Sequence, residues 1–494
     1  MIATTPVTEV KDTISGSVVT SSVKREDIIS DIPGVSTFLM RGIEERGIAS
    51  PKNLSAVVPG LNIPDYGTAM TSTIYVRGLG SRMDNPVIGL YVDDVPVLDK
   101  NCYDFSFADI RSLEFQHGPQ GTLYGRNSML GVLSVETLSP SVFQGIRASI
   151  EYGSAATVSA KASIYKGKLG LAAAYSHSDG LYVNEYDNSR CGLSDAASLR
   201  AVFVGKVGRA TYDNILTLSY TDQTGYPYRL WLPDEGWLLP IDYNDRSGYK
   251  RLTVMDGLRL KADLGGWKLS SVTSVQMLFD SMDMDQDFTP ESIFTLNQTQ
   301  RQFAATQEII LRPSVRPDWW DSQTGVFLMV KLNRMSAPVD FLEGGIKSLI
   351  LDNANSGIPE DLGRLDILED RFRISSDFDI TTSNLAAYHE SVFSLGRWRL
   401  TAGLRLDYEG GRMRYDSNSG IHFILAPAMP DYIPFNTFLE GNESVNCLQL
   451  QPKVSVIYDA ADSRMKAKRI GLKFSATVSK GYRGGGFNTQ IFSD

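Results

Sequence analysis

Three aspartates at alternate positions, Asp283, Asp285 and Asp287, are the most suggestive set of metal ligands in the sequence. Calcium prefers carboxylate oxygens, and an EF-hand loop supplies them from alternating positions. That loop also needs a glycine and a final glutamate where this chain has Phe288 and Phe294. We therefore expect no calcium or other metal site, and we interpret the aspartates as strand-end carboxylates beside an outward loop.

Histidines and cysteines form no recognisable catalytic pattern. The histidines are scattered, and the sequence has no HExxH pair, phosphate-binding glycine loop or GxSxG elbow. The cysteines are widely spaced and odd in number, which fits neither a disulfide framework nor a zinc site. These residues are His117, His177, His389, His422, Cys102, Cys191 and Cys447. The sequence thus predicts a protein that is not an enzyme and has no cofactor.

The charge of the chain argues against another class of function. The 494 residues have a net charge of −9, without a polybasic segment, so nucleic-acid binding is not expected. No apolar run has the length of a membrane-spanning helix. Met1 to Val10 lacks an apolar signal-peptide core, so a signal peptide is not expected within this numbering.

The elements that would position any site begin with a compact, glycine-rich N-terminal part. Gly118 to Thr137 has four glycines ahead of an apolar run. Glycine permits positive backbone angles and close backbone approach, so this stretch predicts tight loops that lead into a buried strand. Further expected elements are a helix over Ser36–Arg46 and strands over Thr73–Arg77, Val87–Val92 and Ile110–Phe115.

From about residue 141 onward, apolar and polar residues alternate. In Trp398–Tyr408, every second residue is apolar or aromatic, and those between are polar or glycine. Short links between such segments alternate with long ones, which include Asp222–Val254, Asn333–Ser383 and Glu409–Leu448. Alternating short turns and long loops are typical of an outer-membrane barrel, whereas a soluble sandwich usually has turns of similar length.

Aromatic residues are placed as in the two girdles of such a barrel. Trp267 and Trp398 begin strands directly after short turns, and Tyr175, Tyr220 and Tyr408 fall towards the opposite ends. The interpretation therefore favours a membrane protein over a soluble β-rich lectin or hydrolase, which remains an alternative.

The number of strands predicts an unclosed sheet. The alternation gives about thirteen strands of roughly ten residues, the length that a tilted strand needs to cross a bilayer. Unpaired edges of an open sheet would leave unsatisfied backbone groups in lipid. We therefore expect that the barrel is incomplete in this chain, that the chain stops in an outward loop at Gly481–Asp494, and that it does not transport by itself.

These motifs together match a known family. The N-terminal part resembles the plug of TonB-dependent outer-membrane transporters through Ile74–Gly78 (IYVRG), Gly89–Pro96 (GLYVDDVP) and Gly118–Thr137. The barrel part is similar to the branch that contains the pesticin and yersiniabactin receptor, through Met284–Pro290, Gln307–Glu308 and Gly481–Asn488 (GYRGGGFN). The plug positions that match are Gly78, Asp93, Gly118, Pro119, Gly121, Tyr124 and Gly125.

The resemblance implies a mainly β fold, with an N-terminal α+β plug domain inside a transmembrane antiparallel β-barrel of about twenty-two strands. The expected domains are a mobile arm over 1–30, the plug over 31–140 and the N-terminal part of the barrel over 141–494. In place of the family's usual Arg-Gly-Pro, this chain has His117-Gly118-Pro119 at the end of a plug strand.

The resemblance also implies a function. Family members import ferric siderophores, or less often haem, cobalamin or glycans, across the Gram-negative outer membrane. The implied partners are TonB with its inner-membrane energising complex, outer-membrane lipid, and a small ligand such as an iron chelate. A surface receptor or adhesin with a vestigial plug is the alternative of another class.

Three groups of site residues follow from the resemblance. The arm is expected to contain the TonB-contacting box at DTISGSVV, through Asp12, Thr13, Ile14, Ser15, Val18 and Val19. Arg77 and Arg126 are expected to lock the plug by pairing with barrel carboxylates.

The third group lies in the long loop Asp222–Val254, whose aromatic residues suit a bulky ligand above the plug. The candidates are Tyr226, Tyr228, Trp231 and Trp237. Self-packing of a large loop, together with a contribution from the membrane interface, is the alternative explanation for these residues.

Overall fold

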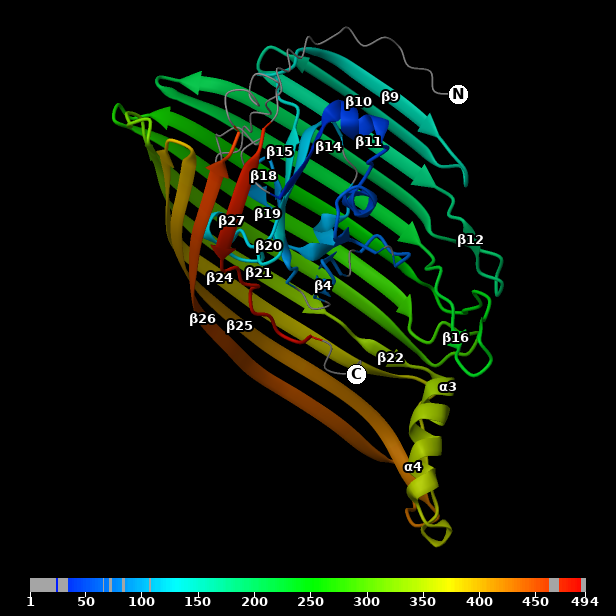
Figure 1. Cartoon of the computed structure of the whole chain (residues 1–494). Coiled ribbons are helices and arrows are strands. Elements are labelled where there is room, and N and C mark those ends of the chain that lie inside the picture. Colours follow the sequence, from blue (N-terminus) through cyan, green and yellow to red (C-terminus); the bar gives the residue numbers. More distant parts are fainter. Residues whose placement is uncertain are drawn as a thin grey trace.

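The computed structural model describes residues 24, 34–64, 66–70, 73–81, 85–105, 108–461 and 471–489. A small N-terminal domain lies against the concave face of a large, curved antiparallel sheet (Figure 1). The predicted mainly β fold class is confirmed. Within the described ranges, no helix has the length and apolar character needed to cross a membrane.

The N-terminal domain is built around a five-stranded sheet with the strand order β1-β7-β8-β5-β6. β5 runs parallel to β8, with Ile88 opposite Gly131. Leu54, Ile88 and Leu113 are fully buried in its apolar core. Its elements are β1 (Val35–Leu39), α1 (Met40–Glu45), the 3-10 helix η2 (Pro51–Ala56), β2 (Leu61–Asn62), β3 (Tyr75–Val76), β4 (Leu79–Gly80), β5 (Ile88–Val92), β6 (Val95–Pro96), the 3-10 helix η3 (Lys100–Tyr103), β7 (Ile110–His117), α2 (Gly121–Tyr124) and β8 (Gly131–Thr137).

Two local predictions in this domain need correction. The helix predicted over Ser36–Arg46 is wrong for its first half, because β1 pairs with β7 and only α1 is helical. Sheet pairing thus overrides the local helical pattern. The strand predicted over Thr73–Arg77 shortens to β3, because Arg77 has a positive φ of 52° and begins a turn.

The large sheet has fifteen strands, thirteen of which follow one another along its path from β9 to β27. Each neighbouring pair is antiparallel. The strands on this path are β9 (Gly145–Tyr152), β10 (Val158–Lys166), β11 (Leu169–Ser178), β14 (Leu193–Val207), β15 (Ala210–Thr224), β18 (Gly248–Asp263), β19 (Trp267–Asp285), β20 (Phe294–Pro313), β21 (Trp320–Ser336), β24 (Phe372–Leu395), β25 (Trp398–Ala426), β26 (Ile433–Asp459) and β27 (Lys473–Ser479). The expected total of about twenty-two strands stays a prediction.

The alternation in β25 separates the two faces of this sheet. Leu404 and Leu406 are 49% and 45% exposed on the outer face, whereas Arg405 and Asp407 are 1% and 0% exposed on the inner face. The aromatic side chains predicted as girdles, including Trp267, are also exposed. An apolar outer face around a polar, filled interior is the arrangement of a membrane barrel wall.

Strands near the end of the chain are much longer than the predicted ten residues. β24, β25 and β26 have 24, 29 and 27 residues. The long loop predicted over Glu409–Leu448 is therefore mostly strand. The backbone pairing of these strands continues beyond the apolar band of the sheet. Both faces of a strand are in polar surroundings there, so the alternation of apolar and polar residues that predicts a strand is lost.

The other long connections leave from one end of the sheet and contain short elements (Figure 1). These elements are β12 (Tyr182–Val183), β13 (Arg190–Cys191), β16 (Trp231–Leu232), β17 (Trp237–Leu238), β22 (Val339–Phe341), α3 (Glu343–Gly345), the π-helix η4 (Ile346–Leu351), α4 (Asp352–Gly357), the 3-10 helix η5 (Glu360–Leu362) and β23 (Arg364–Ile367). The short turns after β10, β14, β18 and β24 lie at the opposite end of the sheet.

Candidate functional site

The N-terminal domain meets the sheet along the glycine stretch between β7 and β8. Gly118 and Gly125 have positive φ angles of 81° and 68°. A side chain at Gly125 would overlap the guanidinium of Arg405 on β25, and one at Gly121 would overlap Gln451 on β26. Glycine is therefore needed at these two positions for close approach to the sheet.

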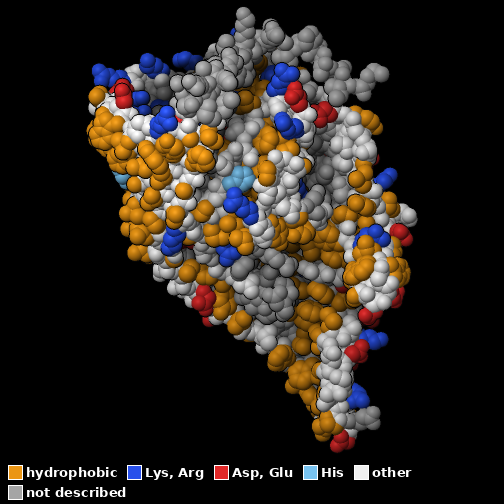
Figure 2. Space-filling view, in the orientation of Figure 1, with side chains coloured by type: hydrophobic (Ala, Val, Ile, Leu, Met, Phe, Trp, Pro, Cys, Tyr) orange, Lys and Arg blue, Asp and Glu red, His pale blue; other side chains and the backbone are white. Residues whose placement is uncertain are grey.

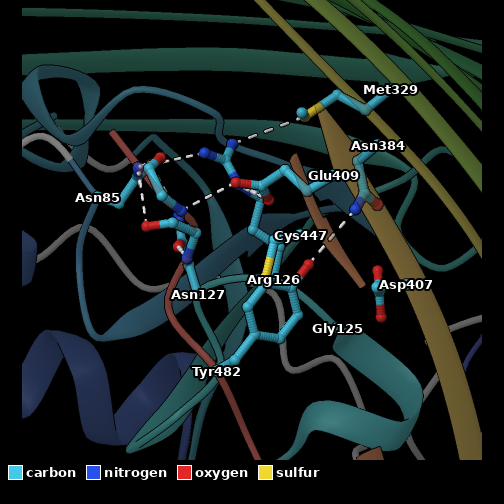
Figure 3. Close-up of polar contacts among 12 residues, drawn as sticks. Asn85, Gly125, Arg126, Asn127, Met329, Asn384, Asp407, Glu409, Cys447 and Tyr482 are labelled. Atoms are coloured by element: carbon cyan, nitrogen blue, oxygen red, sulfur yellow. Dashed lines mark hydrogen bonds and ion pairs between the residues drawn. The ribbon is translucent and has the colours of Figure 1, made fainter. Parts of the chain in front are cut away.

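A buried ion pair joins the two parts at this junction. Arg126 Nε lies 2.9 Å from Glu409 Oε2 on β25, and the two side chains are only 8% and 5% exposed (Figure 3). Arg126 Nη2 also donates to Asn85 Oδ1 at 2.9 Å. Breaking a buried pair leaves an uncompensated charge, so this contact resists separation of the domain from the sheet.

The glycine-rich segment after β27 completes this cluster. Gly485 N donates to Glu409 Oε1 at 2.9 Å, and Asn85 Nδ2 donates to Gly485 O at 2.6 Å. Tyr482 forms a parallel bridge with Arg126. Its hydroxyl accepts from Asn384 Nδ2 at 3.4 Å (Figure 3). The outward loop predicted over Gly481–Asp494 is thus wrong for residues 481–489. The Gly484 amide donates to Asn127 of the N-terminal domain, and the Gly485 amide donates to Glu409 on the inner face of the sheet, so this segment lies between the two.

A second buried group lies beside the glycine stretch on β25. Arg405 donates to both carboxylate oxygens of Asp407, at 2.6 and 3.1 Å. Its guanidinium carbon lies 5.2 Å from the centroid of the Tyr388 ring. Tyr388 donates its hydroxyl to Glu308 Oε1 at 2.8 Å. The inner face here is a connected network of charged and polar groups.

Lys24, from the N-terminal arm, is held in the same network. Its Nζ lies 3.1 Å from Glu308 Oε2, with the side chains 2% and 3% exposed. Nζ also donates to Leu123 O at 3.0 Å and lies 4.7 Å from the centroid of the Tyr124 ring. Burial lowers the pKa of Lys24, and the neighbouring Glu308 opposes that shift. Sequence reasoning missed this contact, because nothing marks one lysine in a Ser- and Thr-rich arm.

The two arginines predicted as plug locks differ in their surroundings. Arg77 is exposed in the turn between β3 and β4, and it forms no ion pair with any carboxylate in the described part of the chain. Arg126 has the predicted kind of partner. A further pair that the sequence did not predict joins Asp94 to Arg259 on β18, with Oδ2 and Nη1 3.3 Å apart.

The remaining matched motif positions have structural roles. Asp93, which has a φ of 49°, accepts hydrogen bonds from the Thr137 amide at 2.9 Å and its hydroxyl at 2.6 Å, which joins the β5–β6 turn to β8. Gly78 has a positive φ of 80° in the turn after Arg77. Pro119 O accepts from Ser479 Oγ at 3.0 Å.

The predicted ligand loop divides into a buried and an exposed half. Tyr226 is fully buried and donates its hydroxyl to Gly248 O at 2.8 Å. Tyr228 packs edge-on against Phe288, with ring centroids 4.8 Å apart. Self-packing therefore accounts for these two tyrosines. Trp231 and Trp237, on the β16–β17 hairpin, are 51% and 50% exposed and are the pair available to a ligand.

The side chains of Asp285 and Asp287 accept hydrogen bonds from backbone amides a few residues further along the chain. Asp285 Oδ1 accepts from the Phe288 amide at 2.8 Å, and Asp287 Oδ1 accepts from the Thr289 amide at 3.0 Å. Across the residues that the structure describes, no group of three or more acidic, histidine or cysteine side chains is arranged to hold a metal. The TonB box predicted over Asp12–Val19 lies outside the described residues.

Comparison with known proteins identifies the family. The model of the TonB-dependent receptor plug domain matches residues 26–132, and that of the TonB-dependent receptor-like β-barrel matches residues 192–494. The second match alone covers more than half of the chain. The chain belongs to the TonB-dependent receptor family, a family of outer-membrane receptors rather than enzymes. We therefore call its N-terminal domain the plug.

Particular relatives agree with this family. Pesticin receptors of Yersinia enterocolitica and Yersinia pestis are 40% identical over 100 residues, which is 20% of this chain and 15% of theirs. The crystal structure of the ferric yersiniabactin uptake receptor FyuA from Yersinia pestis aligns with a TM-score of 0.69 and 20% identity, over 92% of this chain and 65% of that one. The siderophore receptor PiuA from Acinetobacter baumannii aligns with a TM-score of 0.64 and 12% identity, over 90% and 64%.

The sequence identities and coverages decide what these comparisons show. At such identities, the aligned structures show the fold alone. The chain spans about two thirds of the length of the two aligned receptors and matches a much smaller part of the pesticin receptors. The domain boundaries predicted near residues 30 and 140 stay predictions.

Proposed function

We propose that this chain is part of a receptor that imports a scarce ligand, a ferric siderophore, across the outer membrane with energy supplied through TonB. The observation that carries the proposal is the plug, held against the inner face of a membrane-type sheet by buried ion pairs. Such contacts would hold the plug in the pore. A mechanical pull transmitted by TonB could separate them. The relatives named for pesticin, yersiniabactin and siderophores support a ferric siderophore as the cargo.

In this proposal, the arm transmits the pull. TonB, with its inner-membrane energising complex, would bind the arm ahead of Lys24. Lys24 contacts Glu308 on the sheet and Leu123 on the plug, so tension on the arm acts first on this contact. Displacement of Lys24 leaves Glu308 buried without its cation, which favours further movement of the plug. Arg126 and Glu409 then form the next barrier.

Growth on defined nutrients tests the function. Cells with and without the complete gene would be grown on ferric siderophores, haem, cobalamin or glycans as limiting sources, in strains with and without TonB. We expect growth on a ferric siderophore that needs both the gene and TonB. Growth restricted to haem, cobalamin or a glycan would assign that cargo instead. Ligand accumulation that persists without TonB would identify a surface receptor or adhesin and contradict import.

A further inference from the structure

The outer face of the large sheet changes from apolar to basic towards its long-loop end. Figure 2 shows hydrophobic side chains gathered along the flanks of the molecule. The outward side chains of β21 up to Leu332 are apolar and exposed, and the next one is Arg334. On the neighbouring β20, Phe303 is the last apolar side chain of this face, and Arg301 follows it towards the loops. Both arginines are exposed and lie at the margin of the apolar band.

Strand register places four charged side chains in one row at this margin. Arg301 lies opposite Arg334, Arg334 lies opposite Asp379, and Asp379 lies opposite Arg414. The row thus crosses β20, β21, β24 and β25. Like charges that lie directly opposite each other destabilise a sheet, so Arg301 and Arg334 repel each other unless an anion lies between them. An anion bound at this position would stabilise the protein.

The aspartate of the row neutralises only part of its charge. Asp379 Oδ1 lies 3.1 Å from Arg334 Nε, and these side chains are 62% and 83% exposed. Such an exposed pair contributes little and leaves most of the guanidinium accessible. Within the part of the chain that the structure describes, the side chains of Arg301 and Arg414 form no ion pair or hydrogen bond. One carboxylate therefore serves three arginines.

Other charged groups of the outer face are ordered by their distance from the apolar band. Arg412, one position nearer the band than Arg414, adds a fourth cation and donates from Nε to Asn442 Oδ1 at 2.9 Å. One position further from the band, Asp377 lies opposite Asp416, and Asp416 lies opposite Glu440. From the band outward, the face is thus first apolar, then cationic and only then acidic. An anion at the margin of the band meets the arginines before the carboxylates.

We infer that this arginine row binds a phosphate group of an anionic lipid whose acyl chains cover the apolar face below it. A membrane lipid has its phosphate at the boundary between acyl chains and water, which is where Arg301 and Arg334 lie. The planar guanidinium presents paired N–H groups that match phosphate oxygens, so the two opposite arginines can hold one headgroup from two sides. Long loops of outer-membrane barrels face the exterior, so the lipid belongs to the outer leaflet. This inference does not depend on the cargo or on TonB.

Native mass spectrometry of the purified chain in a neutral detergent provides the test. The probe is lipid A, a glucosamine-based lipid with two phosphates, compared with diacylglycerol, which has acyl chains but no phosphate. Inorganic phosphate is added as a competitor. The row variant combines Arg301→Gln with Arg334→Gln. The matched control combines Arg209→Gln with Arg397→Gln, which removes two exposed arginines from the short turns after β14 and β24.

We expect the row variant to bind lipid A about tenfold more weakly, while the control stays within about twofold of the unmodified chain. Asp379→Asn removes the carboxylate of the row, so it should instead strengthen lipid A binding by about twofold to threefold. Added salt should weaken the binding of lipid A, because the row is exposed to solvent. Diacylglycerol should bind equally to all four proteins, because their apolar faces are the same.

Three outcomes would contradict the inference. Equal weakening of lipid A binding in the row variant and the control would show a general effect of positive charge and overturn the site. Loss of diacylglycerol binding in the row variant would show that its apolar face is disturbed and overturn the assignment to phosphate. Displacement of lipid A by an equal concentration of inorganic phosphate would overturn the assignment to a lipid, because free phosphate lacks the acyl chains.

Discussion

At the scale of single residues, Arg126 and Arg77 make a matched pair of plug arginines. Arg126 is buried against Glu409, whereas Arg77 is exposed. Arg126→Ala leaves Glu409 buried without its cation, which we expect to destabilise docking of the plug by about 3–5 kcal/mol. Arg77→Ala should change it by less than about 0.5 kcal/mol.

Conductance of the complete receptor in planar bilayers, with increasing urea, measures this difference. Arg126→Ala should leak at a lower urea concentration than the unmodified receptor, and Arg77→Ala should match the latter. Equal leakage of the two alanine variants would remove Arg126 as a lock. The double variant Arg126→Met with Glu409→Met should recover part of the loss, because it leaves no buried charge unpaired.

His117 predicts a dependence on pH. Its Nε2 lies 3.3 Å from Ser36 Oγ, its ring packs edge-on against Phe115, and burial, followed by the charge of Arg77, lowers its pKa below the usual 6.5. The unfolded plug therefore takes up a proton before the folded plug does as the pH falls through 6.5. Stability is unaffected by this group above 6.5 and decreases between 6.5 and the lower, folded-state pKa.

Guanidinium unfolding of the plug from about pH 7.5 to about pH 5 checks this sign. The unmodified protein should lose more stability across that range than His117→Asn, which cannot be protonated. The difference should be modest, because the ring is partly exposed to solvent. Parallel curves for the two proteins would contradict the prediction.

At the scale of elements, substitutions in and beside the β16–β17 hairpin can test ligand binding and stability separately. Trp231 and Trp237 are half exposed, whereas Tyr226 is buried in the same loop. Changing both tryptophans to alanine should leave the free energy of unfolding within about 0.5 kcal/mol and reduce affinity for the ligand by at least about tenfold. Tyr226→Ala should instead destabilise the protein by about 3–5 kcal/mol.

Denaturant unfolding and growth at limiting concentrations of the ferric chelate that the complete receptor uses would give the two readouts. Undiminished growth of the double tryptophan variant would exclude the hairpin from the ligand site. A loss of stability in that variant would show that the hairpin is structural, as Tyr226 is.

The same elements show how far sequence reasoning reaches. Trp398–Tyr408 was predictable because one face meets lipid and the other a polar interior, which produces a strict alternation. The continuation of β25 to Ala426 was not, because its outer face no longer needs apolar side chains once it leaves the lipid. Ser36–Leu39 has a helical pattern but pairs with β7, a contact with residues far along the chain.

The candidate site also has residues that could be predicted from the sequence and residues that could not. The role of Arg126 followed from the family resemblance, but its partner depends on the register of β25, which places Glu409 on the inner face. The pairs Lys24–Glu308 and Asp94–Arg259 join distant segments without any local signal. Contacts between a plug and its wall are set by the way the sheet curves around the plug, and no periodicity in the sequence encodes that geometry.

At the scale of the whole molecule, β9 and β27 are the edge strands of the sheet in the part of the chain that the structure describes. Among the described residues, β9 pairs only with β10, and β27 only with β26, whereas β15 has partners on both sides. The edge strands also present apolar side chains to the outside, such as Ile150 at 78% and Val478 at 78% exposed. In lipid, each unpaired backbone group on these edges costs several kcal/mol, so the sheet requires further pairing to be stable there.

Hydrogen exchange of the purified chain tests the state of these edges. We expect alternate amides of β9 and β27 to exchange rapidly while those of β15 stay protected, because only the latter are bonded on both sides. In a longer receptor that closes the sheet, the same amides of β9 should become protected, and discrete plug-gated conductance should appear. Protection of β9 in the chain alone, together with such conductance, would show that its edges already pair, and would contradict the open sheet.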